Sequence, residues 1–160
     1  MKQFVVFIGI VIWGCIAFAQ SGSYDPNTGD SSLDSMLINV NNEAQSDSVT
    51  FIAEMSVEFN VPETTISQLY VDESIQPADI YVLLLIAHEQ KKSLDSLLPL
   101  YKKNRGKGWK VVLKAMNAHK PAMVKLLKSN AGKKQKALQE RRKMKEKIKM
   151  KTDKKNPKSK

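Results

Sequence analysis

A short basic segment in the second half of the chain is the first candidate for ligand chemistry. Arg105, Lys107 and Lys110 surround two glycines just before a predicted helix that starts at Trp109. Free backbone N–H groups and the helix dipole favour an anion at such a helix start. The segment lacks the G-x-x-x-x-G-K-[ST] pattern of a phosphate-binding loop, so the alternative is a sharp turn before a buried tryptophan.

The C-terminal segment is the second candidate for anion binding. Residues 132–160 hold fourteen basic and three acidic residues. Such a stretch binds phosphates, lipopolysaccharide, anionic lipid or nucleic acid with little selectivity, and the alternative is a solubilising tail without a partner. Its apolar stripe is thin, so we expect a solvated, partly helical extension that is disordered after about Thr152. The candidate anion-binding residues here are Lys133, Lys134, Lys136, Arg141, Arg142, Lys143 and Lys145.

Catalytic, metal and cofactor motifs are missing from the sequence. His88 and His119 stand alone, without the histidine or cysteine spacing of metal centres. No G-x-S-x-G elbow marks a serine nucleophile. The predicted helix pair around Asn117 has the layout of a helix-turn-helix, but an exported protein does not meet the chromosome. We therefore expect a non-enzymatic protein with no cofactor, no metal and no specific DNA recognition.

The first 19 residues predict a signal peptide. Lys2 supplies the positive start, residues 4–13 form an apolar run, and Ala17-Phe18-Ala19 is a cleavage site that would leave Gln20 as the mature N-terminus. A membrane anchor is the alternative, but residues 4–19 are fewer than the roughly 20 needed to cross a bilayer. We expect a periplasmic or secreted protein with no membrane span after processing.

Cys15 allows a third interpretation of the N-terminus. Residues 12–15 resemble a bacterial lipobox, in which the cysteine carries lipid, although Trp13 stands where a small or aliphatic residue is usual. Because Cys15 is the only cysteine, cleavage after Ala19 leaves a mature protein without one. Disulfides, thiolate zinc sites and iron–sulfur clusters are then excluded together.

Charge divides the mature chain into an acidic and a basic half. Residues 20–90 hold twelve acidic residues and no Lys or Arg, whereas residues 91–131 hold eleven basic residues and one acid. The leading hypothesis is that the surplus charge of the basic tail, within a formal net charge of +10, associates with anionic envelope components or polyanions. The alternative is a structural or self-associating protein whose acidic half pairs with basic segments of itself or a neighbour.

Apolar spacing predicts an all-α, bundle-like domain of about six short helices over residues 31–130. A flexible, turn-rich leader over 20–30 precedes it, and the basic tail over 131–160 follows it. The first helix should run unbroken over 31–59, capped by Ser31 or Ser32, and the apolar run over 78–90 should be the central helix. The later helices are expected to open at Pro62, Pro77, Ser93, Trp109 and Pro121.

Several short motifs, taken in order, resemble a family of uncharacterised exported bacterial small helical proteins. The main ones are Thr28-Gly29-Asp30 with Leu33-Asp34 after it, Pro77-Ala78-Asp79-Ile80-Tyr81, and Gly106-Lys107-Gly108-Trp109. The resemblance covers roughly residues 28–129. It implies a small helical secreted domain and carries over no activity and no catalytic residue. This chain departs from the family in having Lys110 and Asn117 where glycines are usual.

Overall fold

The computed structural model describes residues 24–155, which form seven α-helices joined by short loops. No strand occurs within this range, so the predicted all-α class is confirmed. The predicted signal peptide, Cys15 and the first residues of the leader lie outside the described residues. The helices are α1 (Ser31–Ser46), α2 (Ser48–Phe59), α3 (Glu63–Val71), α4 (Pro77–Gln90), α5 (Leu94–Asn104), α6 (Trp109–Ala115) and α7 (Pro121–Lys155).

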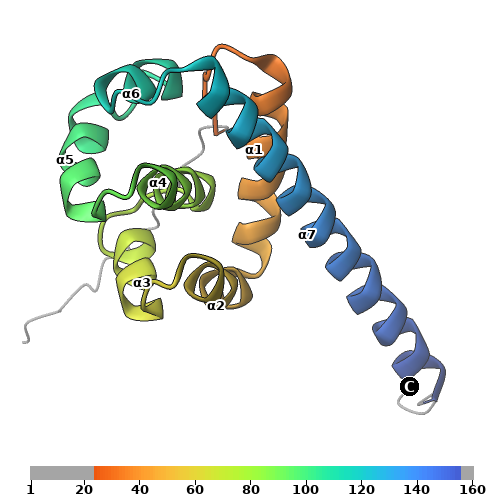
Figure 1. The fold of residues 1–160 in the computed structure, drawn as a ribbon. Coiled ribbons are helices and arrows are strands. Elements are labelled where there is room, and N and C mark those ends of the chain that lie inside the picture. Colours follow the sequence, from red (N-terminus) through yellow and green to blue (C-terminus); the bar gives the residue numbers. More distant parts are fainter. Residues whose placement is uncertain (1–23, 156–160) are drawn as a thin grey trace, which may run out of the picture.

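Helix α4 is the centre of the bundle, and α1, α2, α3, α5 and α6 surround it (Figure 1). Every residue from Pro77 to Ile86 is buried. A helix that is apolar on all sides has no face to offer to water, so its neighbours must cover it completely. Pro77 occupies the first turn, where a missing N–H costs nothing, and Lys91 ends the helix with a left-handed φ of 52°. The prediction that this run is the central helix is confirmed.

The prediction of a single helix over 31–59 is wrong, because the helix is interrupted at Asp47. This residue has an extended φ of −151°, and its carboxylate accepts a hydrogen bond from the N–H of Thr50. Asp47 therefore ends α1 and caps α2, the position that aspartate favours over a helix interior. The start of α1 also differs from the prediction, since its cap is Asp30, which accepts from the N–H of Leu33 at 3.0 Å.

Helix α7 is far longer than the short last core helix that the sequence suggests. It packs along α1, and its C-terminal end projects from the bundle (Figure 1). The expected boundary near residue 130 falls inside this helix, because Ala131 and Leu138 continue the buried side begun by Leu127. The predicted helical extension is present, and it is helical through Lys155. Within the described residues, no helix has the length and apolarity to cross a membrane.

Candidate functional site

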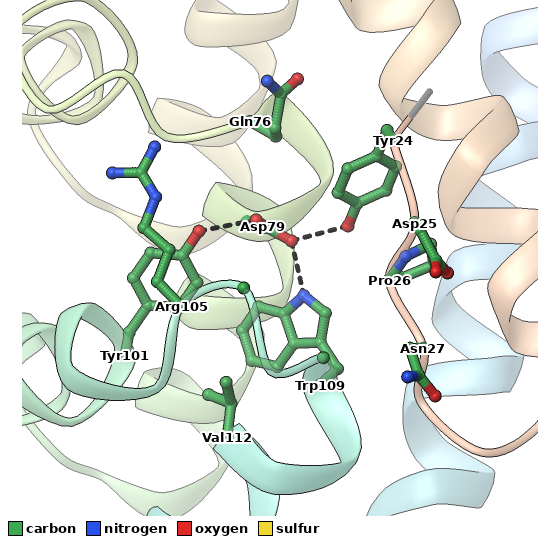
Figure 2. A pocket seen from close by; sticks show the side chains of 12 residues that line it. Tyr24, Asp25, Pro26, Asn27, Gln76, Asp79, Tyr101, Arg105, Trp109 and Val112 are labelled. Carbon is green, nitrogen blue, oxygen red and sulfur yellow. Dashed lines mark hydrogen bonds between the residues drawn. The ribbon is translucent and has the colours of Figure 1, made fainter. Parts of the chain in front are cut away.

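A buried carboxylate, Asp79, lies where four segments of the chain meet. The hydroxyl groups of Tyr24 and Tyr101 donate hydrogen bonds of 2.6 Å to its two oxygens, and the indole N–H of Trp109 donates to the oxygen that Tyr24 also reaches. Figure 2 shows the three donors converging on the carboxylate from the leader, α5 and α6. We call Asp79, Tyr24, Tyr101 and Trp109 the Asp79 cluster.

Burial dominates the electrostatics of the Asp79 cluster. Asp79 is only 8% exposed, and this desolvation raises the pKa of its carboxyl, while the hydrogen bonds from Tyr101, Tyr24 and Trp109 oppose the shift. Burial, followed by the charge of Asp79, also raises the pKa values of Tyr24 and Tyr101. Both phenols therefore stay protonated and keep donating. The arrangement satisfies a buried acid with neutral donors and fixes the elements that carry them.

The leader is held against α6 by its backbone as well as by Tyr24. The N–H groups of Trp109 and Lys110 donate to the carbonyls of Pro26 and Asn27 at 2.7 and 3.0 Å. Gly108 allows this approach, because a Cβ there would lie 2.7 Å from the Cβ of Asn27. The described part of the leader, over 24–30, packs against the helical domain, with Pro26 and Thr28 buried, a contact that the expectation of a flexible leader did not include. Backbone pairing with a distant helix leaves no local sequence pattern, so the prediction missed it.

A cavity of about 320 Å³ lies between the leader and the loop that precedes α6, with Asp79 among its lining residues. Arg105 also lines it, and its guanidinium donates to the backbone carbonyls of Glu73 and Ser74 at 3.1 and 2.6 Å. Asp79 already accepts three hydrogen bonds, and none of its donors is an activated nucleophile or a base. The geometry is that of a hydrogen-bonded cluster that holds the leader, α5 and α6 on α4, next to a cavity that is open to solvent.

The structure does not bring the predicted basic loop together as an anion site. The N–H groups of Trp109 and Lys110 are already bonded to the leader, so the start of α6 does not offer them to an anion. Arg105 is held by two carbonyls, Lys107 is exposed, and the aliphatic part of Lys110 lies against Gly29. The predicted anion site depended on free N–H groups at the start of α6. The leader, some 80 positions earlier in the chain, accepts hydrogen bonds from two of these groups.

The basic residues of α7 divide into two groups, of which the first pairs with the acidic helices. Lys134 is the most buried cation among the described side chains, with 9% of its side chain exposed, and its Nζ lies 3.1 Å from a carboxylate oxygen of both Glu54 and Glu58. We call this line of ion pairs between α7 and the N-terminal acids the charged seam. Its other pairs are Lys128–Asp30, Arg141–Glu54, Arg142–Glu43 and Lys145–Asp47.

Hydrogen bonds from the basic side chains perturb the acids at both ends of the charged seam. The hydrogen bond from Lys145, followed by one from Thr50, lowers the pKa of Asp47 to about 2. The pKa of Asp30 is lowered by the N–H of Leu33 and then by Lys128. Helical spacing puts Glu43, Asp47 and Glu54 off the apolar stripe of residues 33–59, where solvent exposure is the default expectation. Their partners lie 80 to 100 positions away, and helical periodicity alone does not identify such pairs.

The second group of basic residues on α7 faces away from the bundle. Helical geometry places Lys133, Lys136 and Lys143 on the side opposite the buried Leu138. Lys147 and Lys151 continue the same line, and all five side chains are exposed. Among the described residues, none of the five has a carboxylate within ion-pair distance. We call these five lysines the outer lysine row.

The two histidines stay apart, as their positions in the sequence suggest. His88 packs edge-on against Phe59, with ring centroids 6.1 Å apart, and its Nδ1 lies 3.4 Å from a carboxylate oxygen of Glu89. His119 lines a shallow hollow beside Pro121. In residues 24–152, no group of three histidine, cysteine or acidic side chains is placed to hold a metal ion.

Sequence reasoning missed the Asp79 cluster, although one signal was present. Asp79 follows Pro77 and precedes ten residues of which most are apolar, so local signals place it in the first turn of a helix rather than in the core. Aspartate on a helix that is buried all round needs donors, and nearby tyrosines and a tryptophan are the residues that supply them. Comparisons with protein-family models, curated proteins and solved structures found no match to this chain.

Proposed function

We propose that this is an exported, non-enzymatic helical protein that associates, through its basic C-terminal helix, with anionic components of the cell envelope or with other polyanions. The outer lysine row is the observation that carries the proposal. Its five exposed ammonium groups lie on one side of a single helix, which also carries the exposed Glu140, and none of the five forms an ion pair among the described residues. A line of like charges attracts a polyanion and releases its counterions on binding.

The charged seam supports the same proposal by defining which cations are already used. Lys134, Arg141 and Lys145 form ion pairs with acids in α2 or at the junction between α1 and α2, so their charges are already paired within the fold. Such pairing also favours the intramolecular form of the alternative, in which the acidic half is matched by the chain's own basic helix. The acidic half is therefore a poor surface for a second copy, and the outer lysine row is the surface left for a partner.

Export is proposed from the N-terminal sequence. The positive start, the apolar run and the small residues before Gln20 support a Sec signal peptide, and the motif order described above supports a small secreted domain. Periplasm and extracellular space both present anionic polymers and lipid headgroups.

Charge removal on α7 tests the proposal more cleanly than deletion of the tail. Deleting residues 132–160 would also remove Lys134 and Leu138, which are buried against the bundle. A variant in which Lys136, Lys143 and Lys147 are changed to glutamine leaves the charged seam intact. Its matched control changes three exposed lysines elsewhere, Lys103, Lys114 and Lys120, to glutamine.

We expect the outer-row variant to elute from immobilised heparin at clearly lower salt than the wild type, and the control to elute close to the wild type. Both variants carry the same net charge, so a difference reports position rather than total charge. Equal elution of the two variants, or no retention of the wild-type protein, would contradict the proposed function.

A further inference from the structure

The outer lysine row faces away from the whole bundle. The bundle packs against the opposite side of α7, where Leu127, Ala131 and Leu138 are buried. Lys133 to Lys151 covers about 27 Å of helix. Figure 1 shows that α7 is straight and that its C-terminal end extends clear of the other helices, beyond the last ion pair with the bundle, which Lys145 makes. A flat surface can therefore contact the full row without meeting the rest of the protein.

Exposed apolar side chains lie among the lysines over residues 144–150 of α7. Met144 is 65% exposed, and Ile148 and Met150 are each 59% exposed. The 100° step of a helix places Met144 and Met150 on either side of the line through Lys143 and Lys147. Contact with a soluble polyanion would leave these side chains in water, whereas the headgroup region of a bilayer takes up apolar side chains as well as cations.

We propose that α7 lies on an anionic lipid bilayer with the outer lysine row facing the headgroups. The ammonium groups contact lipid phosphates, and Met144 and Met150 enter the interface beside them, with Ile148 at the edge of that face. The charged seam stays within the protein and holds the bundle on the side of α7 away from the lipid. This inference rests on the proposed function and narrows its partner to anionic lipid.

The test uses the protein purified after export, so that no uncleaved signal peptide contributes to membrane binding. Binding is measured by co-sedimentation with vesicles of phosphatidylglycerol and phosphatidylcholine, with pure phosphatidylcholine vesicles as the uncharged reference. Two variants are compared with the wild type. The first is the outer-row variant with glutamine at positions 136, 143 and 147, and the second is Met144→Gln combined with Ile148→Gln.

We expect the wild type to bind the anionic vesicles and not the uncharged ones. The outer-row variant should bind about a hundredfold more weakly at low ionic strength, since three lysines leave the surface. The Met144→Gln, Ile148→Gln variant should lose vesicle affinity and keep heparin affinity. Circular dichroism checks that both variants retain their helices.

The outcomes separate this inference from the proposed function. Heparin binding that depends on the outer lysine row, without vesicle binding by the wild type, would overturn the lipid inference and leave the proposed function standing. Vesicle binding that is unchanged in the Met144→Gln, Ile148→Gln variant would also overturn it, since the apolar side chains would then not enter the interface. Failure to bind either heparin or anionic vesicles would overturn both.

Discussion

The hydroxyl group of Tyr24 donates a 2.6 Å hydrogen bond to the carboxylate of Asp79, 55 positions later in the chain. This bond joins the leader to the central helix. Trp109 shares the same carboxylate oxygen, and its backbone N–H holds Pro26. The leader is thus part of the folded domain from Tyr24 onward, and Asp79 is the group around which the leader, α5 and α6 are fixed.

Removal of the Asp79 carboxylate should strongly destabilise the protein. Asp79→Ala leaves the donors of Tyr24, Tyr101 and Trp109 without an acceptor, and each buried donor without a partner costs about 1–3 kcal/mol. Asp79→Asn keeps one acceptor oxygen and should cost less. Urea unfolding followed by circular dichroism measures the free energy of unfolding of both variants. Equal stability of Asp79→Ala and the wild type would show that the cluster does not hold the fold.

The two glycines before α6 should respond differently to substitution. Both have a positive φ, 84° for Gly106 and 81° for Gly108, so alanine strains the backbone at either site, and at Gly108 a ψ of 156° puts the residue in a region that is essentially restricted to glycine. Only at Gly108 would the added Cβ also collide with Asn27, whereas at Gly106 it meets open space. We expect Gly108→Ala to lower the unfolding midpoint clearly more than Gly106→Ala. Matching midpoints would mean that the leader does not pack against the loop as described.

The charged seam should be visible in the titration of Asp47. Its pKa is lowered from 3.8 to about 2, with the hydrogen bond from Lys145 as the largest cause. Such a lowered pKa stabilises the fold above pH 3.8, and this contribution is lost as the pH falls toward 2. In Lys145→Gln the pKa should rise toward 3.8, measured by carboxyl ¹³C NMR. An unchanged Asp47 pKa in that variant would place Lys145 in solvent.

Processing should give a mature protein that starts at Gln20. Ala17 and Ala19 present the small side chains that signal peptidase accepts. Intact-mass spectrometry of the exported protein checks this, allowing for cyclisation of the terminal glutamine. A mass that includes a lipidated Cys15 would assign the protein to a membrane anchor instead.

Local sequence signals predicted the elements of the fold well. The helix starts at Pro77 and Trp109 follow from residues that are neighbours in sequence. The break at Asp47 was missed because the apolar stripe continues across it. Capping by one aspartate outweighed that periodicity.

The candidate sites could not be predicted as well, because they depend on residues that are distant in sequence. The sequence identified the basic residues of α7 but could not separate Lys134, which is buried between two glutamates, from Lys136, which is exposed. Helical phase relative to Leu138 separates them once the buried side is known. The docking of Pro26 and Asn27 on α6 depends on backbone atoms, which every residue carries, so side-chain patterns give no sign of it.

The charged seam also determines the order in which the protein can complete its fold. Glu43 and Arg142 are 99 positions apart, so Glu43 gains its partner only after the 99 residues that follow it have been made. Neighbouring helices such as α4, α5 and α6 contact one another over short loops, which close at lower entropic cost. We expect these to form the folding nucleus and α7 to dock last. The charged seam should then form after the transition state for folding. Weakening it should therefore speed unfolding and leave the refolding rate almost unchanged.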